Sequence, residues 1–197
     1  MGLLNLSFNA PAQEKKEYYA TGELRAMGYL NADQKEGEWK YFYPTGKKNA
    51  IENYTKGLLN GTVYYFFPNE TLQGKENWIL GILMDSAWYY HSNGALQRKG
   101  RYQNSEYIGT WFHFFENGKV ERIVNYRKGL PNGTTLVFND QGIRIQEGFY
   151  QDGLEAGNWK FYSQTGELEF EGQYVGGQPA GIWYQFMKGK KKVYKRY

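Results

Sequence analysis

Glycine recurs every 24 residues along most of this 197-residue chain. Several registers that share one period indicate tandem copies of one structural unit. One glycine series precedes aromatic-rich segments and consists of Gly37, Gly61, Gly109, Gly133, Gly157 and Gly181. A second series consists of Gly22, Gly46, Gly94, Gly118, Gly142 and Gly166. Such spacing restricts the fold to an array in which each unit packs on its neighbours.

Aromatic residues follow the same period. The position two residues after the first glycine series is a tryptophan slot, with Val63 and Thr135 as exceptions. The slot is occupied by Trp39, Trp88, Trp111, Trp159 and Trp183. An aromatic three residues later is found at Phe42, Phe66, Phe114, Phe138, Tyr162 and Phe186. We interpret Ser86 and Trp88 as a slipped copy, in which one residue is gained before Trp88 and one is lost after it.

The units read as β-hairpins. Short aromatic and β-branched segments alternate with turn sequences such as Glu116-Asn-Gly118, and no segment has the apolar spacing of a helix. We therefore expect an all-β fold, an elongated single-layer antiparallel sheet of about seven tandem 24-residue hairpins over residues 18–197. With 19 Tyr, 12 Phe and 6 Trp, ladders of rings across neighbouring strands can stabilise such a thin sheet.

The repeated segments resemble a known family. The segments that begin at Gly37, Gly109 and Gly157 each continue through a tryptophan to a glycine nine residues later. They are similar to the MORN-repeat variant, the bacterial form found in proteins labelled the YwqK family of toxin-antitoxin antitoxins. The resemblance implies a string of hairpins without an active site, which neutralises a toxin by direct binding. It transfers no binding residue to this sequence.

The sequence contains no recognisable catalytic motif. There is no Cys, and the two histidines, His91 and His113, belong to no metal-binding or nucleophile signature. His113 lies between two phenylalanines of an expected strand, which favours a structural role. Glu167, Glu169 and Glu171 alternate, and this pattern is typical of a solvated strand face. We predict no enzymatic activity, no cofactor and no metal.

Both ends of the chain differ from the repeats. We expect residues 1–17 to be a leader, either disordered or the remnant of a signal peptide, because Ala10-Pro-Ala12 has the small-x-small pattern of a signal-peptidase site. This pattern favours export or the cell envelope of a bacterium, with the cytoplasm as the alternative. The positive charge is concentrated in residues 188–196, so no basic stripe for nucleic acid is expected. Lysines on a last strand would instead prevent edge-to-edge pairing.

The apparent slip suggests a contact patch for a partner. Its residues are Leu83, Met84, Tyr89, Tyr90 and His91. Aromatic and methionine surfaces suit protein partners, and a toxin is the partner that the family resemblance implies. Two other functions remain open: glycan binding in the cell envelope through exposed rings, and peripheral membrane binding through the basic tail. The open sheet edges permit either a monomer or end-to-end association.

Overall fold

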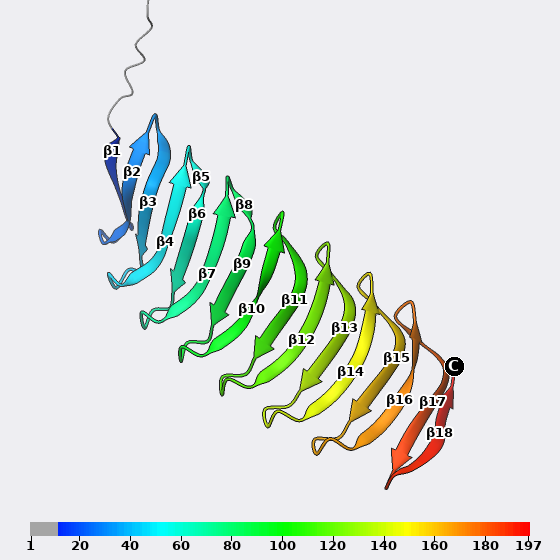
Figure 1. The fold of residues 1–197 in the computed structure, drawn as a ribbon. Coiled ribbons are helices and arrows are strands. Elements are labelled where there is room, and N and C mark those ends of the chain that lie inside the picture. Colours follow the sequence, from blue (N-terminus) through cyan, green and yellow to red (C-terminus); the bar gives the residue numbers. More distant parts are fainter. Residues whose placement is uncertain (1–11) are drawn as a thin grey trace, which may run out of the picture. The chain divides into compact units, whose positions relative to one another are not determined.

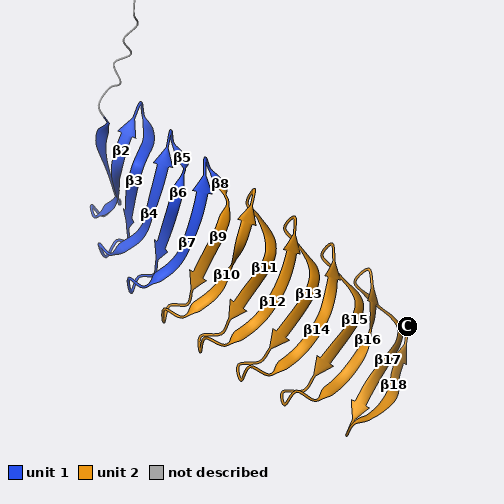
Figure 2. Cartoon of the chain, in the orientation of Figure 1, with its two compact units in different colours: residues 1–82 blue, residues 83–197 orange. Residues whose placement is uncertain are grey.

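The computed structural model describes residues 12–197, and within this range the secondary structure is entirely β (Figure 1). The fold class predicted from the 24-residue period is therefore confirmed. No helix among these residues is long and apolar enough to span a membrane. The chain divides into two compact units, Met1–Ile82 and Leu83–Tyr197 (Figure 2).

Unit 1 contains an antiparallel sheet in which strands pair in chain order. Its strands are β1 (Gln13–Tyr18), β2 (Leu24–Asn31), β3 (Gln34–Phe42), β4 (Lys48–Thr55), β5 (Leu58–Leu59), β6 (Gly61–Phe66) and β7 (Leu72–Ile79). Strand β4 pairs with both β5 and β6, because these two short strands follow one another along the same edge of β4. The boundary between the two units falls within β8 (Ile82–Leu83).

Unit 2 contains the longer series of hairpins. Its strands are β9 (Asp85–Tyr90), β10 (Leu96–Gln103), β11 (Glu106–Phe114), β12 (Val120–Arg127), β13 (Leu130–Phe138), β14 (Arg144–Gln151), β15 (Leu154–Tyr162), β16 (Leu168–Val175), β17 (Gln178–Met187) and β18 (Lys190–Arg196). Each strand from β9 to β17 is antiparallel to the next. Because no strand crosses over another, this unit is a single open layer (Figure 1).

Two kinds of turn alternate along the sheet. At one end the turn has two residues, such as Lys128 and Gly129, with φ of 50° and 77°. Two successive positive φ values define a type I′ turn, whose twist matches that of paired strands. At the other end, the Gly118 N–H donates a hydrogen bond of 2.9 Å to the Phe115 carbonyl oxygen, and Gly118 has a φ of 81°. Both turns recur with the predicted period.

The predicted slip around Trp88 is wrong, because the 24-residue register continues without interruption. Asp85, with a φ of 62°, occupies the backbone position of Gly61 and Gly109. Ala87, which is fully buried, therefore occupies the tryptophan slot, and Trp88 lies on the other face of the sheet. The large Trp88 beside the small Ala87 hides this register in the sequence, because the slot is defined by backbone position and not by side-chain size.

The ends of the array also differ from expectation. Strand β1 begins at Gln13 and pairs with β2, so residues 13–17 belong to the sheet and not to a leader. Residues 10 and 11 of the predicted cleavage motif lie outside the described residues. At the other end, Lys188 and Gly189 form a two-residue turn that departs from the period. It leads into β18, whose residues are all exposed.

Candidate interaction surface

The sheet has two faces of different character. We call the side that carries the tryptophan slot the tryptophan face, and the other side the opposite face; successive residues of a strand alternate between them. The slot residues are among the most deeply buried of residues 12–197. They are Trp39, Val63, Ala87, Trp111, Thr135, Trp159 and Trp183, all no more than 6% exposed.

Each tryptophan of the slot packs on a glycine eleven residues earlier in the sequence, on the preceding strand. A Cβ added to Gly148 would lie 2.1 Å from a ring atom of Trp159, which is far inside any allowed contact. The Trp159 indole N–H donates to the Phe149 carbonyl oxygen at 3.2 Å. The same packing occurs in the pairs Gly28–Trp39, Gly100–Trp111 and Gly172–Trp183. The glycine thus makes room for the ring, and the ring covers its backbone.

Where the slot lacks tryptophan, the residue eleven positions earlier is no longer glycine. Glu52 precedes Val63, and Val124 precedes Thr135. The Tyr54 hydroxyl donates to Glu52 at 2.5 Å, so this carboxylate is hydrogen-bonded. Thr135 donates to the Ile123 carbonyl oxygen at 3.1 Å. The size of the slot residue is therefore matched to that of the residue eleven positions earlier.

At Thr135 neither partner is large, and a hollow of about 370 Å³ opens on the tryptophan face. Val124 and Thr135 are paired across β12 and β13, and both line it. It is lined by Glu121, Arg122, Val124, Tyr126, Pro131, Thr135, Val137, Gln146 and Tyr150. This volume is within the range of small-ligand sites. The sequence showed Thr135 only as an exception to the tryptophan pattern.

A row of basic side chains runs beside this hollow. Arg98 pairs with His113 across β10 and β11, and His113 pairs with Arg122 across β11 and β12. Burial, together with the positive charges of Arg122 and Arg98, lowers the pKa of His113 to about 4. His113 is therefore neutral near pH 7. Its Nε2 atom and the Nε atom of Arg98 are buried and have no hydrogen-bond partner among residues 12–197.

The opposite face of unit 2 carries an apolar row, which we define as Phe112, Ile123 and Leu136. Phe112 pairs with Ile123, and Ile123 pairs with Leu136, so the three side chains are neighbours on β11, β12 and β13. All three are partly exposed. Next to Leu136 the same row continues in charged residues, beginning with Glu147 and Lys160, which form an ion pair of 3.1 Å.

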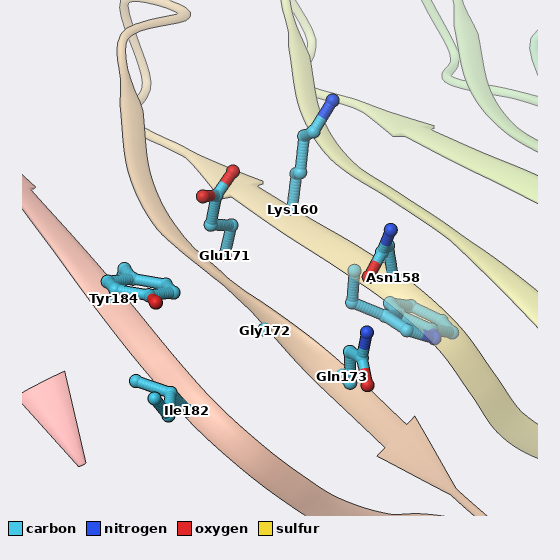
Figure 3. A pocket seen from close by; sticks show the side chains of 8 residues that line it. Asn158, Lys160, Glu171, Gly172, Gln173, Ile182 and Tyr184 are labelled. Carbon is cyan, nitrogen blue, oxygen red and sulfur yellow. The ribbon is translucent and has the colours of Figure 1, made fainter. Parts of the chain in front are cut away.

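Further along this face, a second hollow of about 330 Å³ lies over Gly172. Figure 3 shows Lys160 on β15, Glu171 on β16 and Tyr184 on β17 around it. The Glu171 carboxylate forms an ion pair of 2.5 Å with Lys191. Both charged groups at this hollow are therefore neutralised by residues of the chain itself, in contrast to the basic row at the first hollow.

The five residues predicted as a contact patch do not form one surface. Leu83 is only 8% exposed, so it belongs to the core. Tyr89 and Tyr90 are successive residues of β9 and point to opposite faces. His91 lies in a turn, where its Nε2 forms a 2.9 Å hydrogen bond with the Phe114 carbonyl oxygen. The Met84 sulfur accepts the Asn104 N–H at 3.1 Å. Most of the set therefore has structural contacts.

The described residues offer few groups for catalysis. Residues 12–197 contain no cluster of three His, Asp or Glu side chains that could hold a metal ion. His91 is occupied by the turn contact, and His113 has arginines rather than a carboxylate or nucleophile as its neighbours in the row. The described residues instead provide a binding surface, which consists of aromatic rings, an apolar row and a row of basic side chains.

Comparison with protein families identifies the repeats. A model described as the MORN repeat variant matches three segments, residues 35–56, 107–128 and 156–175. Together these segments make up less than half of the chain. Each contains a tryptophan of the slot, namely Trp39, Trp111 or Trp159. The chain is thus an all-β repeat protein with MORN-variant segments, as the sequence resemblance predicted. No curated protein matches it.

Several solved structures align with the chain at low similarity. The crystal structure of the GtfA/B complex bound to UDP and GlcNAc has 12% identity, with 71% of this chain and 24% of that chain covered and a TM-score of 0.22. The TcdB2-TccC3-Cdc42 structure has 12% identity, coverages of 91% and 13%, and a TM-score of 0.23. The Photorhabdus luminescens Tc holotoxin pore has 11% identity, coverages of 93% and 13%, and a TM-score of 0.18.

The chain thus spans 24% or less of these much longer chains. TM-scores this low do not establish a shared fold, and no function follows from the alignments.

Proposed function

We propose that this protein is a non-enzymatic repeat scaffold that binds another protein, and that its role is to neutralise a toxin as an antitoxin or immunity protein. The observation that carries the proposal is the apolar row on the opposite face. Phe112, Ile123 and Leu136 lie side by side on three paired strands, partly exposed. An apolar centre bordered by polar groups is the usual composition of a protein-binding surface.

The charged end of the row supports a protein partner over a lipid surface. Beyond Leu136, the row continues through Glu147, Lys160 and Glu171, whose charges alternate in sign. Alternating charges fix the register of a complementary protein surface, whereas an anionic membrane attracts basic side chains of one sign. The MORN-variant segments support the scaffold role, and the antitoxin role rests on the family resemblance of the sequence.

The experiment uses cells whose growth is stopped by the product of a gene that neighbours the gene of this protein. The chain is co-expressed with that product. We expect growth to be restored and the two proteins to co-elute. The double variant Phe112→Ala/Leu136→Lys should lose both effects, because it removes apolar area and adds a charge to the row. Leu130→Lys is the matched control, since Leu130 is 50% exposed and lies at a turn, outside the row.

The proposal is contradicted if no neighbouring gene product is neutralised and the purified chain is retained on cell-wall polysaccharide or on anionic vesicles. The scaffold would then bind a ligand other than a protein. Retention on polysaccharide would point to glycan binding by exposed rings. Retention on vesicles that is lost when residues 188–197 are deleted would point to the basic tail.

A further inference from the structure

The unit that contains Thr135 lacks the ring that fills the corresponding space elsewhere. Trp111, Trp159 and Trp183 occupy this slot in other units of the same sheet. In the Thr135 unit the slot is filled by the buried side chains of Val124 and Thr135, and a hollow of about 370 Å³ opens beside them, with Tyr126 and Tyr150 among its lining residues. Val124, Pro131 and Val137 line it as well. The hollow therefore has apolar walls and two tyrosine rings beside it.

The cation next to the hollow forms no ion pair with the residues that the structure describes. Arg122 lines the hollow and is exposed, and no carboxylate among residues 12–197 forms an ion pair with it. Arg98 and His113 extend the row over two more strands. His113 is neutral near pH 7, so the positive charges of Arg98 and Arg122 face one another across one intervening strand and repel each other. An anion bound at this row would relieve that repulsion.

His113 lies between positively charged side chains of the two neighbouring strands. From β10 and β12 it faces Arg98 and Arg122, and Tyr89 and Tyr126 lie further along the same face. Glu121, on β12, lines the hollow, and the structure shows no ion pair between it and the basic row. The Nε2 atom of His113 is buried without a partner.

We propose that the hollow at Thr135 is a binding site for a flat aromatic ring joined by a short linker to a carboxylate. The ring lies in the hollow, against Val124 and Thr135 and beside Tyr126 and Tyr150. The carboxylate accepts hydrogen bonds from the Arg122 guanidinium, whose forked donors suit a carboxylate in two-point contact. His113 lies next to Arg122 in the row and responds to the added negative charge.

Two sources could present this chemistry: a free aromatic acid, or a peptide whose C-terminal residue is tryptophan. The probes are indole-3-propionate for the first and N-acetylglycyl-tryptophan with a free carboxylate for the second. Indole, propionate and inorganic phosphate are the controls that separate the ring from the charge. A tenfold preference for either of the two probes identifies the source.

The measurement is the affinity of each probe by calorimetry, together with the ring resonances of the two histidines by NMR. We expect at least tenfold tighter binding of indole-3-propionate than of indole or propionate. The pKa of His113 should rise from about 4 when the probe is bound, because the carboxylate offsets the arginine charges. His91, whose Nε2 forms a hydrogen bond with the Phe114 carbonyl oxygen at the end of β11, does not line the hollow and should not change.

Two variants test the site. Val124→Gly/Thr135→Trp recreates the glycine–tryptophan pair of the other units, and it should abolish binding by filling the hollow. Glu52→Gly/Val63→Trp makes the same change in unit 1 and should leave binding intact. Arg122→Gln, at an exposed position, should weaken the binding of both acids at least tenfold and leave the binding of indole unchanged. Arg127→Gln on the same strand is its control. Arg122→Gln keeps the proposal falsifiable if the first variant does not fold.

Equal affinity for phosphate and indole-3-propionate would overturn the proposal, because the row would then bind anions without the hollow. Unchanged binding by folded Val124→Gly/Thr135→Trp would overturn it too. The site lies on the tryptophan face and the apolar row lies on the opposite face. Failure here therefore leaves the proposed protein-binding function standing, and the reverse is also true.

Discussion

Gly148 and Trp159 lie so close across β14 and β15 that a Cβ at position 148 would be 2.1 Å from the indole ring. The indole ring fits only because Gly148 has no side chain, and the ring in turn covers the glycine backbone. This mutual dependence, repeated in the other tryptophan units, explains how a single sheet layer keeps a buried core without a second layer packed on it.

The first prediction concerns this contact. Gly148→Ala should lower the free energy of unfolding by about 3 kcal/mol, because the indole ring must move to admit a methyl group. Gly157→Ala is the matched control, since nothing lies within 4 Å of its Cβ position and only its φ of 64° opposes the change. It should cost about 1 kcal/mol. Urea titration of both variants measures the difference, and equal losses would contradict the packing argument.

The second prediction concerns the type I′ turns. Lys128 has a φ of 50°, a conformation that asparagine adopts more easily than lysine. Lys128→Asn should therefore raise the free energy of unfolding by about 0.5 kcal/mol. Gly129→Ala, at a φ of 77°, should lower it by about 1 to 2 kcal/mol. Thermal unfolding can report both changes. A stabilising Gly129→Ala would mean that this turn has another conformation in solution.

The third prediction concerns pH. The pKa of His113 is lowered to about 4 in the folded state, chiefly by burial, against about 6.5 in the unfolded chain. The unfolded state thus binds a proton first as the pH falls, so stability should decrease between pH 6.5 and pH 4. We expect a loss of about 1 to 2 kcal/mol, since the side chain is only half-buried.

The control for this pH effect is His113→Gln, which has no titrating group at that position. The difference in stability between the two proteins, measured at each pH, isolates the histidine from the carboxylates. A parallel decline of both proteins between pH 6.5 and pH 4 would show that His113 titrates normally.

The fourth prediction concerns the lysines of β18, a fully exposed strand that pairs with β17. Lys190→Thr/Lys192→Thr/Lys195→Thr removes charges that oppose pairing with another chain, and threonine favours strands. We expect concentration-dependent association in sedimentation velocity, while the starting protein stays at one size. Lys191 is kept because it pairs with Glu171. If the variant sediments like the starting protein, the lysines do not prevent association of the chain through β18.

The fold could be predicted from the sequence because its period is carried by turn residues. Glycines at fixed spacing mark backbone positions with positive φ, and such positions tolerate few alternatives. The register at Asp85 is not visible in the sequence, because an aspartate that adopts a positive φ carries no glycine to mark it. The neighbouring Trp88 hides Ala87 as the slot residue.

The candidate site could not be predicted in this way. The hollow at Thr135 depends on what is missing from one unit, and it becomes visible only when Val124 is recognised as its partner. A signal was present, since Gly28, Gly100, Gly148 and Gly172 each precede a tryptophan by eleven residues. The basic row required the pairing of three strands, which places Arg98, His113 and Arg122 together although they are distant in sequence.

The most direct test of the account is a double-mutant cycle between Gly148 and Trp159. Gly148→Val and Trp159→Thr should each cost about 3 kcal/mol or more, one through overlap with the ring and the other through its loss. The double variant recreates the Val124–Thr135 pair, so its loss should be smaller than the sum by about 2 kcal/mol or more. Additivity within about 0.5 kcal/mol would show that the two residues act independently, and would contradict the matched pair as the unit of this fold.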